Sequence, residues 1–261
     1  MPRYWVQKAN RVKATRCRDA ACRVLDGEML TPVTRHVASL HSQTNKGNRV
    51  RMKGNYILSL INQGEHQQQD FKYKITDAPK LAKSVSAFAN TDGGRLLIGV
   101  RDDGQVAGVR SEEEIYMMHA AAYTYCRPQP SIRFDTHNVG GRTVVIATVP
   151  PSDKRPIFAL SKEKEERNAY IRINDENILA SPVHLRLWRE QQSPRPVVTT
   201  FEESHTLVLE TLQNNPPMTL NQLTRRTRLP RQQVINLLAR FIRYDLAQWK
   251  YDAHQFLFSA R

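Results

Sequence analysis

The sequence predicts an α+β protein made of a mixed-sheet domain and a smaller helical domain. Between residues 55 and 182, strand-like and helix-like segments mix without a strict strand–helix–strand alternation. Pro194 and Pro196 then interrupt the chain, because proline is excluded from helix interiors. Three helical segments and a hairpin pattern follow. We therefore expect four parts: an extension at residues 1–51, the mixed-sheet domain at 52–189, a linker at 190–203 and the smaller helical domain at 204–261.

Two helices of the mixed-sheet domain are indicated by their ends and their apolar spacing. Residues 56–61 form a short amphipathic pattern that Gly64 ends. Asp77 is a favourable N-cap, with Pro79 in the first turn, for a helix that runs to about Ala89. The buried face of this second helix is expected to comprise Leu81, Val85 and Phe88.

Alternating segments predict the strands, at residues 70–75, 95–100, 105–109, 132–137, 143–149 and 169–173. Asp102-Asp-Gly104 is a hairpin turn between the second and third of these segments. Ser111 and Glu114 form a capping box for a helix to about Tyr125.

The last 58 residues, 204–261, carry their own helix signals. A first helix covers residues 204–213, a second is capped by Thr219 with Gln222, and a third runs from Arg231 to about Tyr244. Residues 246–250 and 255–258 would pair as a terminal hairpin. Three helices followed by a hairpin is the order of a winged helix.

The positive charge is concentrated at the start of the chain. Residues 1–51 hold 11 Lys and Arg against 3 Asp and Glu. Their net charge of +8 is more than half of the formal net charge of +14 for the whole chain. Their apolar residues follow no sustained period, so we favour a disordered or non-native extension over a basic arm that grips phosphates. Met52 is a second candidate for the first residue of the protein, because the organised sequence begins just after it. No apolar stretch reaches the roughly 20 residues of a membrane helix, and we expect no membrane partner and a cytoplasmic location.

Three carboxylates are candidate metal ligands. Glu65 and Asp70 lie on the approach to a predicted strand and at its start, and Asp102 lies in the hairpin turn. Carboxylates that converge in a cleft can hold Mg²⁺ or Mn²⁺. Each carboxylate taken alone is more typical of a turn or surface residue.

Basic and amide side chains form two candidate nucleic-acid contacts. Lys72, Lys74, Arg95 and Arg101 flank the carboxylates and could hold a phosphate backbone. The second set lies at the helix-turn-helix corner and on the last helix, where it could contact phosphates and base edges: Arg225, Arg226, Arg228, Arg231, Gln232, Gln233, Asn236 and Arg240. The alternative for the first set is that these residues lie on ordinary solvated strand edges. The alternative for the second set is a winged helix that serves dimerisation or domain packing.

A run of linked motifs resembles a known family. Glu65-x4-Asp70-Phe-Lys72, Val85 to Gly94, and Leu97 to Gly104 are similar to the Schlafen AlbA-type domain, and so are Lys154-Arg-Pro156 and Ala169 to Ile173. The resemblance covers roughly residues 55–182 and implies an α+β fold with nucleic-acid association. Bacterial members are described as DNA-binding domains, often joined to a winged helix.

The resemblance also implies a possible enzyme. Vertebrate members cut transfer and ribosomal RNA with three carboxylates and a divalent metal, at positions that correspond here to Glu65, Asp70 and Asp102. Asp70 departs from the glutamate that the family has there. The active animal domain pairs two such modules and carries a zinc motif, whereas this sequence has one module and no such motif, although a homodimer could supply a second module.

These observations lead to three functional hypotheses. The preferred one is a nucleic-acid-binding protein, DNA-binding and regulatory, with DNA or RNA as partner and no certain cofactor. The alternative is a metal-dependent endoribonuclease that acts on structured RNA such as tRNA, with Mg²⁺ or Mn²⁺. The third is an assembly module whose domains bind only protein.

Overall fold

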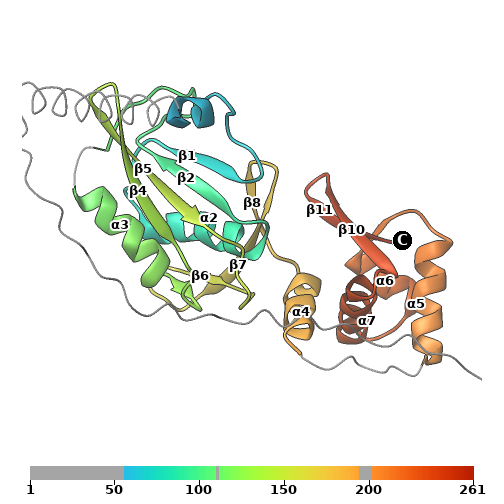
Figure 1. Ribbon diagram of the computed structural model, residues 1–261. Helices are drawn as coiled ribbons and strands as arrows, with labels where there is room; N and C mark the ends of the chain where they lie inside the picture. Colours follow the sequence, from blue (N-terminus) through green and yellow to red (C-terminus); the bar gives the residue numbers. More distant parts are fainter. Residues whose placement is uncertain (1–55, 110–111, 194–200) are drawn as a thin grey trace, which may run out of the picture. The chain divides into compact units, whose positions relative to one another are not determined.

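The computed structural model describes residues 56–109, 112–193 and 201–261 (Figure 1). The extension 1–51, the second start at Met52, Ser111 of the predicted capping box, and Pro194 and Pro196 lie outside these residues.

The first sheet is mixed, as the sequence predicts. Its four strands are β1 (Gln69–Lys72), β2 (Gly94–Ile98), β5 (Arg142–Val149) and β4 (Arg133–Val139), in that spatial order. Strands β1 and β2 run parallel, with Phe71 opposite Leu97, and the other neighbours are antiparallel. Residues 56–61 are helical and bury Ile57 and Leu60 against one face of this sheet.

Helix α2 (Ala78–Asn90) forms the centre of the larger core (Figure 1). Asp77 caps it by accepting a hydrogen bond from the Lys80 backbone N–H at 3.0 Å, and Leu81, Val85 and Phe88 are buried as predicted. Helix α3 (Glu112–Tyr123) packs beside it. Helix α2 also contacts the second sheet, in which β3 (Cys126–Arg127), β6 (Phe158–Leu160), β7 (Arg167–Ile173) and β8 (Glu176–Leu179) are antiparallel neighbours.

The segment predicted as a strand at residues 105–109 is not one. It makes a single bridge, between Val100 and Val106, and then a loop. Gly99 and Gly108 both have positive φ, and a Cβ on Gly99 would lie 2.8 Å from the Gly108 carbonyl carbon. The chain therefore folds back on itself too tightly for a second ladder to continue.

The C-terminal residues form three helices and a three-stranded sheet. These elements are α5 (Glu203–Gln213), β9 (Met218–Thr219), α6 (Leu220–Thr227), α7 (Arg231–Arg243), β10 (Ala247–Asp252) and β11 (Gln255–Ala260). The predicted capping box is present, because Thr219 accepts from the Gln222 backbone N–H and the Gln222 side chain accepts from the Thr219 N–H. The helix–helix–helix–hairpin order is the predicted one.

Helix α4 (Pro182–Gln191) is not among the elements predicted above. Ser181 caps it and Pro182 opens it, which are signals that the sequence contains. Val183 and Leu187 of α4 are buried in the same cluster as Val234 and Leu238 of α7. The boundary expected between residues 189 and 190 therefore falls inside a helix that packs on the C-terminal elements. Within the described segments, no helix combines the length and the apolar character that crossing a membrane requires.

Candidate nucleic-acid interface

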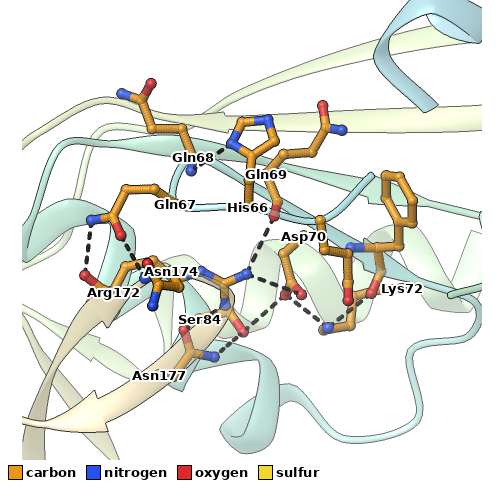
Figure 2. A network of polar contacts seen from close by, with 12 residues as sticks. His66, Gln67, Gln68, Gln69, Asp70, Lys72, Ser84, Arg172, Asn174 and Asn177 are labelled. Carbon is orange, nitrogen blue, oxygen red and sulfur yellow. Dashed lines mark hydrogen bonds and ion pairs between the residues drawn. The ribbon is translucent and has the colours of Figure 1, made fainter. Parts of the chain in front are cut away.

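Asp70 is buried in β1 and is surrounded by donors (Figure 2). Its Oδ2 lies 2.7 Å from Nζ of Lys72 and accepts a 3.4 Å hydrogen bond from the Ser84 hydroxyl. Its Oδ1 lies 3.5 Å from Nη2 of Arg172. Two cations and a hydroxyl therefore lie within 3.5 Å of the Asp70 carboxylate oxygens.

Arg172 reaches Asp70 from β7 of the second sheet. Its side chain is 1% exposed, and it also donates to Oδ1 of Asn177 at 3.0 Å and to the Gln69 carbonyl at 3.3 Å. Its guanidinium carbon lies 5.1 Å from the centroid of the Phe88 ring. A buried arginine requires a counter-ion, and Asp70 supplies it.

Glu65 approaches the same carboxylate. Its Oε1 accepts a 2.7 Å hydrogen bond from the Phe71 backbone N–H. Burial raises the pKa of Glu65, and a hydrogen bond to the neighbouring Asp70 raises it further. The structure thus brings Glu65 and Asp70 together, as two of the three predicted ligands.

Asp102 does not complete a metal site. Its side chain is exposed in the turn of residues 101–104. Across the ranges that the structure describes, no group of three or more His, Cys, Asp or Glu residues is placed to hold a metal ion. The described residues thus show no such cluster at Glu65, Asp70 and Asp102, and the Mg²⁺ or Mn²⁺ site expected there stays a prediction.

Four lysines surround one hollow beside this network. We call this surface the lysine groove, and define it by Lys72, Lys74, Lys80 and Lys83 around a volume of about 390 Å³. Lys72 ends β1, Lys74 follows it, and Lys80 and Lys83 are three residues apart on α2, so they share a helix face. Neutral hydrogen-bonding groups of Thr76, Ser84 and Asn177 line the groove between the lysines.

Half of this groove was predicted from the sequence. Lys72 and Lys74 are among the predicted contacts, whereas Lys80 and Lys83 are not. The signal was present, because the helix that begins at Asp77 and buries Leu81 and Val85 must present Lys80 and Lys83 away from the core.

Arg95 and Arg101 do not join the lysine groove. Arg95 donates to Oε1 of Gln69 at 2.7 Å and lines a different hollow, of about 490 Å³, with Arg133 and His137. The guanidinium carbon of Arg101 lies 4.8 Å from the centroid of the Tyr73 ring. The four predicted basic residues around the carboxylates therefore belong to separate surfaces.

The predicted arginines of the C-terminal part gather at the turn between α6 and α7. Arg225 and Arg226 end α6, Arg228 caps it with a φ of 56°, and Arg231 opens α7; all four are exposed. Arg226 and Arg231 donate to the Asn215 and Asn221 side chains respectively.

The residues of α7 that are predicted to contact base edges differ in their exposure to solvent. Gln232 is exposed and donates to Oδ1 of Asn236 at 3.2 Å, while Gln233 is half-buried. Arg240 is also half-buried, with Nη1 3.4 Å from Nε2 of His205 on α5. Arg240 is therefore directed partly into the domain.

Comparisons with known proteins agree with the sequence resemblance over one part of the chain. Residues 65–181 match the family model described as "Schlafen, AlbA_2". This segment contains Asp70, Arg172 and the whole lysine groove. No curated protein matches the sequence.

Two solved structures are similar at low identity. The DIP2311 protein from Corynebacterium diphtheriae is 17% identical, with a TM-score of 0.42 over 82% of this chain, and this chain spans only 39% of its length. The N-terminal domain of a RecG-related protein from Nitrosomonas europaea is 19% identical, with a TM-score of 0.33. That match covers 57% of this chain and 98% of the domain.

Proposed function

We propose that this chain binds nucleic acid through the lysine groove, with DNA as its target and regulation as its role. The observation that carries the proposal is the convergence of Lys72, Lys74, Lys80 and Lys83 on one hollow. A phosphate backbone that enters such a hollow is neutralised by several ammonium groups at once, and the released counter-ions favour binding.

The neighbouring carboxylates offset only part of this charge. Asp70 is buried and is paired with both Lys72 and Arg172. Asp77 lines the groove and accepts a hydrogen bond from the first turn of α2 while it keeps its charge. Lys74, Lys80 and Lys83 are exposed, and Nζ of Lys83 lies 5.8 Å from the centroid of the Tyr170 ring.

The C-terminal elements support a second contact. We propose that α5, α6, α7 and the β10–β11 hairpin form a winged helix, because their order is that of this fold. The arginines at the α6–α7 turn would contact phosphates, and the exposed Gln232 and its half-buried partner Asn236 would face base edges. The regulatory role and the preference for DNA rest on the resemblance of residues 65–181 to the Schlafen AlbA-type domain.

A titration by fluorescence anisotropy tests the proposal. The full chain is titrated with duplex DNA, single-stranded DNA and structured RNA at several salt concentrations. We expect affinity to fall steeply as salt rises, with a slope of about −0.7 to −0.9 per phosphate contacted. Binding that is absent from all three probes at low salt overturns the proposal.

Charge reversal tests whether binding depends on the lysines of the groove or on the positive charge of the chain as a whole. Lys80→Glu/Lys83→Glu should weaken binding at least tenfold and flatten the salt dependence. Lys154→Glu/Lys164→Glu is the matched control, because both lysines are exposed and lie outside the groove. Equal losses in the two variants would contradict a role for the groove.

A further inference from the structure

We propose that the lysine groove takes a single strand, and that one base of that strand stacks on Tyr116. The inference rests on the proposed function and names the form of nucleic acid that the groove accepts. It is carried by an exposed aromatic ring that lies beside the lysines.

Tyr116 is unusually open for a large aromatic side chain. It lies on α3 and is 72% exposed, although Met118 of the same helix is fully buried. In the described part of the chain, no other ring and no cation packs against the Tyr116 ring. The Tyr116 ring is therefore largely open to solvent and takes part in no aromatic or cation–π contact among the described residues.

Tyr116 stands between two hollows that continue the lysine groove. It lines one of about 540 Å³ with Lys74 and Met117, and another of about 370 Å³ with Ala120 and Lys162. Thr76 lines both of these hollows and the lysine groove as well. A strand that lies in the groove can therefore pass Thr76 and reach the Tyr116 ring without leaving a depressed surface.

The lysines continue along the same path. Lys74 lines the groove and the first of the two hollows, while Lys80 and Lys83 line the groove and a further hollow of about 330 Å³ that also contains Lys162. Three exposed carboxylates, Asp77, Glu113 and Glu166, and the buried Glu114 also line these hollows, against five lysines, Lys72, Lys74, Lys80, Lys83 and Lys162. The surface is therefore basic by a small margin, and its basic side is that of Lys80, Lys83 and Lys162.

This combination distinguishes a single strand from a duplex. Ammonium groups hold phosphates of either form, but a base can stack on tyrosine only if its face is free. In a duplex the base faces are covered by their neighbours. An exposed tyrosine beside a lysine-lined path can therefore stack with a base of a single strand but not with a paired base of a duplex. Met117 and Ala120 offer apolar surface to the same base.

The experiment measures whether affinity depends on bases and on Tyr116 together. Anisotropy titrations compare a thymidine oligonucleotide, the same oligonucleotide with abasic positions, a uridine oligonucleotide and duplex DNA. For the natural chain, removal of the bases should lower affinity about tenfold, and Tyr116→Ala should lower affinity for the intact single strand by a similar factor. Tyr116→Ala should leave affinity for the abasic strand and for the duplex unchanged.

Two variants control for side effects of the substitution. Tyr116→Phe keeps the ring and should retain binding to the intact strand. Tyr123→Ala removes a second exposed tyrosine of α3 that lines none of the hollows described above, and it should also bind as the natural chain does. Thermal melting of each variant shows whether it is folded.

The outcomes separate the inference from the function on which it rests. Salt-dependent binding that is equal for intact strand, abasic strand and duplex, and insensitive to Tyr116→Ala, overturns the single-strand inference and leaves the proposed function standing. The absence of binding to every probe overturns both. Loss of affinity in Tyr116→Ala for the abasic strand and the duplex as well also overturns stacking, because the ring would then act on the backbone or on the fold.

Discussion

Nη2 of Arg172 lies 3.5 Å from Oδ1 of Asp70, and both side chains are almost fully buried. This pair links β7 of the second sheet directly to β1 of the first sheet. A carboxylate that the sequence places in a candidate metal site is thus the counter-ion of an arginine in the protein interior.

Removal of the Asp70 charge should therefore destabilise the fold strongly. Asp70→Ala leaves a buried guanidinium without its counter-ion, and we expect the free energy of unfolding to fall by about 3–5 kcal/mol. Chemical denaturation with urea measures this change.

Asp102→Ala is the matched control for this prediction. Asp102 is exposed, so its substitution should change the free energy of unfolding by no more than about 0.5 kcal/mol. Similar costs at the two positions would contradict the assignment of Asp70 as a structural ion-pair partner.

Local signals explain which parts of the fold could be predicted. The N-cap Asp77, Pro79 and the apolar spacing that follows define α2, and all of these signals lie within a few turns of one another. The predicted strand at residues 105–109 failed, because the tight approach of Gly99 and Gly108 is a tertiary contact that alternation cannot reveal.

In the candidate site, too, the residues marked by local signals could be predicted and the tertiary contacts could not. Lys72 and Lys74 follow from the strand pattern, and Lys80 and Lys83 follow once the helix face is drawn. Arg172 could not be assigned to Asp70 from the sequence, because a hydrogen-bonded pair between distant strands leaves no periodic trace. The continuity of the groove with Tyr116 depends in the same way on how α2 and α3 pack.

Glu65 should make the fold less stable as the pH rises. Its pKa is raised above the ordinary value of 4.5 in the folded state, first by burial and then by Asp70. The unfolded chain therefore loses this proton at lower pH than the folded chain, and stability falls as the pH rises from 4.5 through the folded pKa.

Glu65→Gln tests this consequence, because an amide can still accept from the Phe71 N–H and has no charge to oppose Asp70. We expect a rise in Tm of ~1–2 °C at pH 7, a small gain because the side chain is partly exposed and solvent screens the repulsion. At pH 4 the variant and the natural chain should melt together. Glu113→Gln, at an exposed position of α3, should show no gain at either pH, and a gain equal to that of Glu65→Gln would count against the coupling with Asp70.

His184 should make the fold less stable as the pH falls, which is opposite to the effect of Glu65. It is buried on α4, with its ring centroid 4.6 Å from that of Trp249 and 4.8 Å from that of Phe256, and burial lowers its pKa to about 4. The unfolded chain binds a proton near pH 6.5 and the folded chain does not, so stability is lost as the pH falls from 6.5 toward 4. The loss attributable to His184 is on the order of 3 kcal/mol.

Urea denaturation at pH 7 and pH 4.5 measures this effect. His184→Gln should remove most of the difference between the two conditions, although the variant is expected to be less stable than the natural chain at pH 7. His254→Gln is the control, because His254 is exposed in the β10–β11 turn and should leave the difference intact. A natural chain that is equally stable at both pH values would contradict a neutral, buried His184.

Cys126 should resist alkylation in the folded chain. Its thiol is buried beside the Ala82 carbonyl oxygen, with an Sγ–O distance of 3.7 Å, and burial raises its pKa to about 12. Alkylating reagents attack the thiolate, which is therefore nearly absent at pH 8, and the core around Cys126 also excludes the reagent. We expect peptide mass spectrometry to find the Cys126 peptide unlabelled by iodoacetamide in native buffer and fully labelled in guanidinium. Labelling of this peptide at equal rates in the two conditions would mean that the sheet edge formed by β3 and β6 opens in the native state, and that the burial of Cys126 is not maintained in solution.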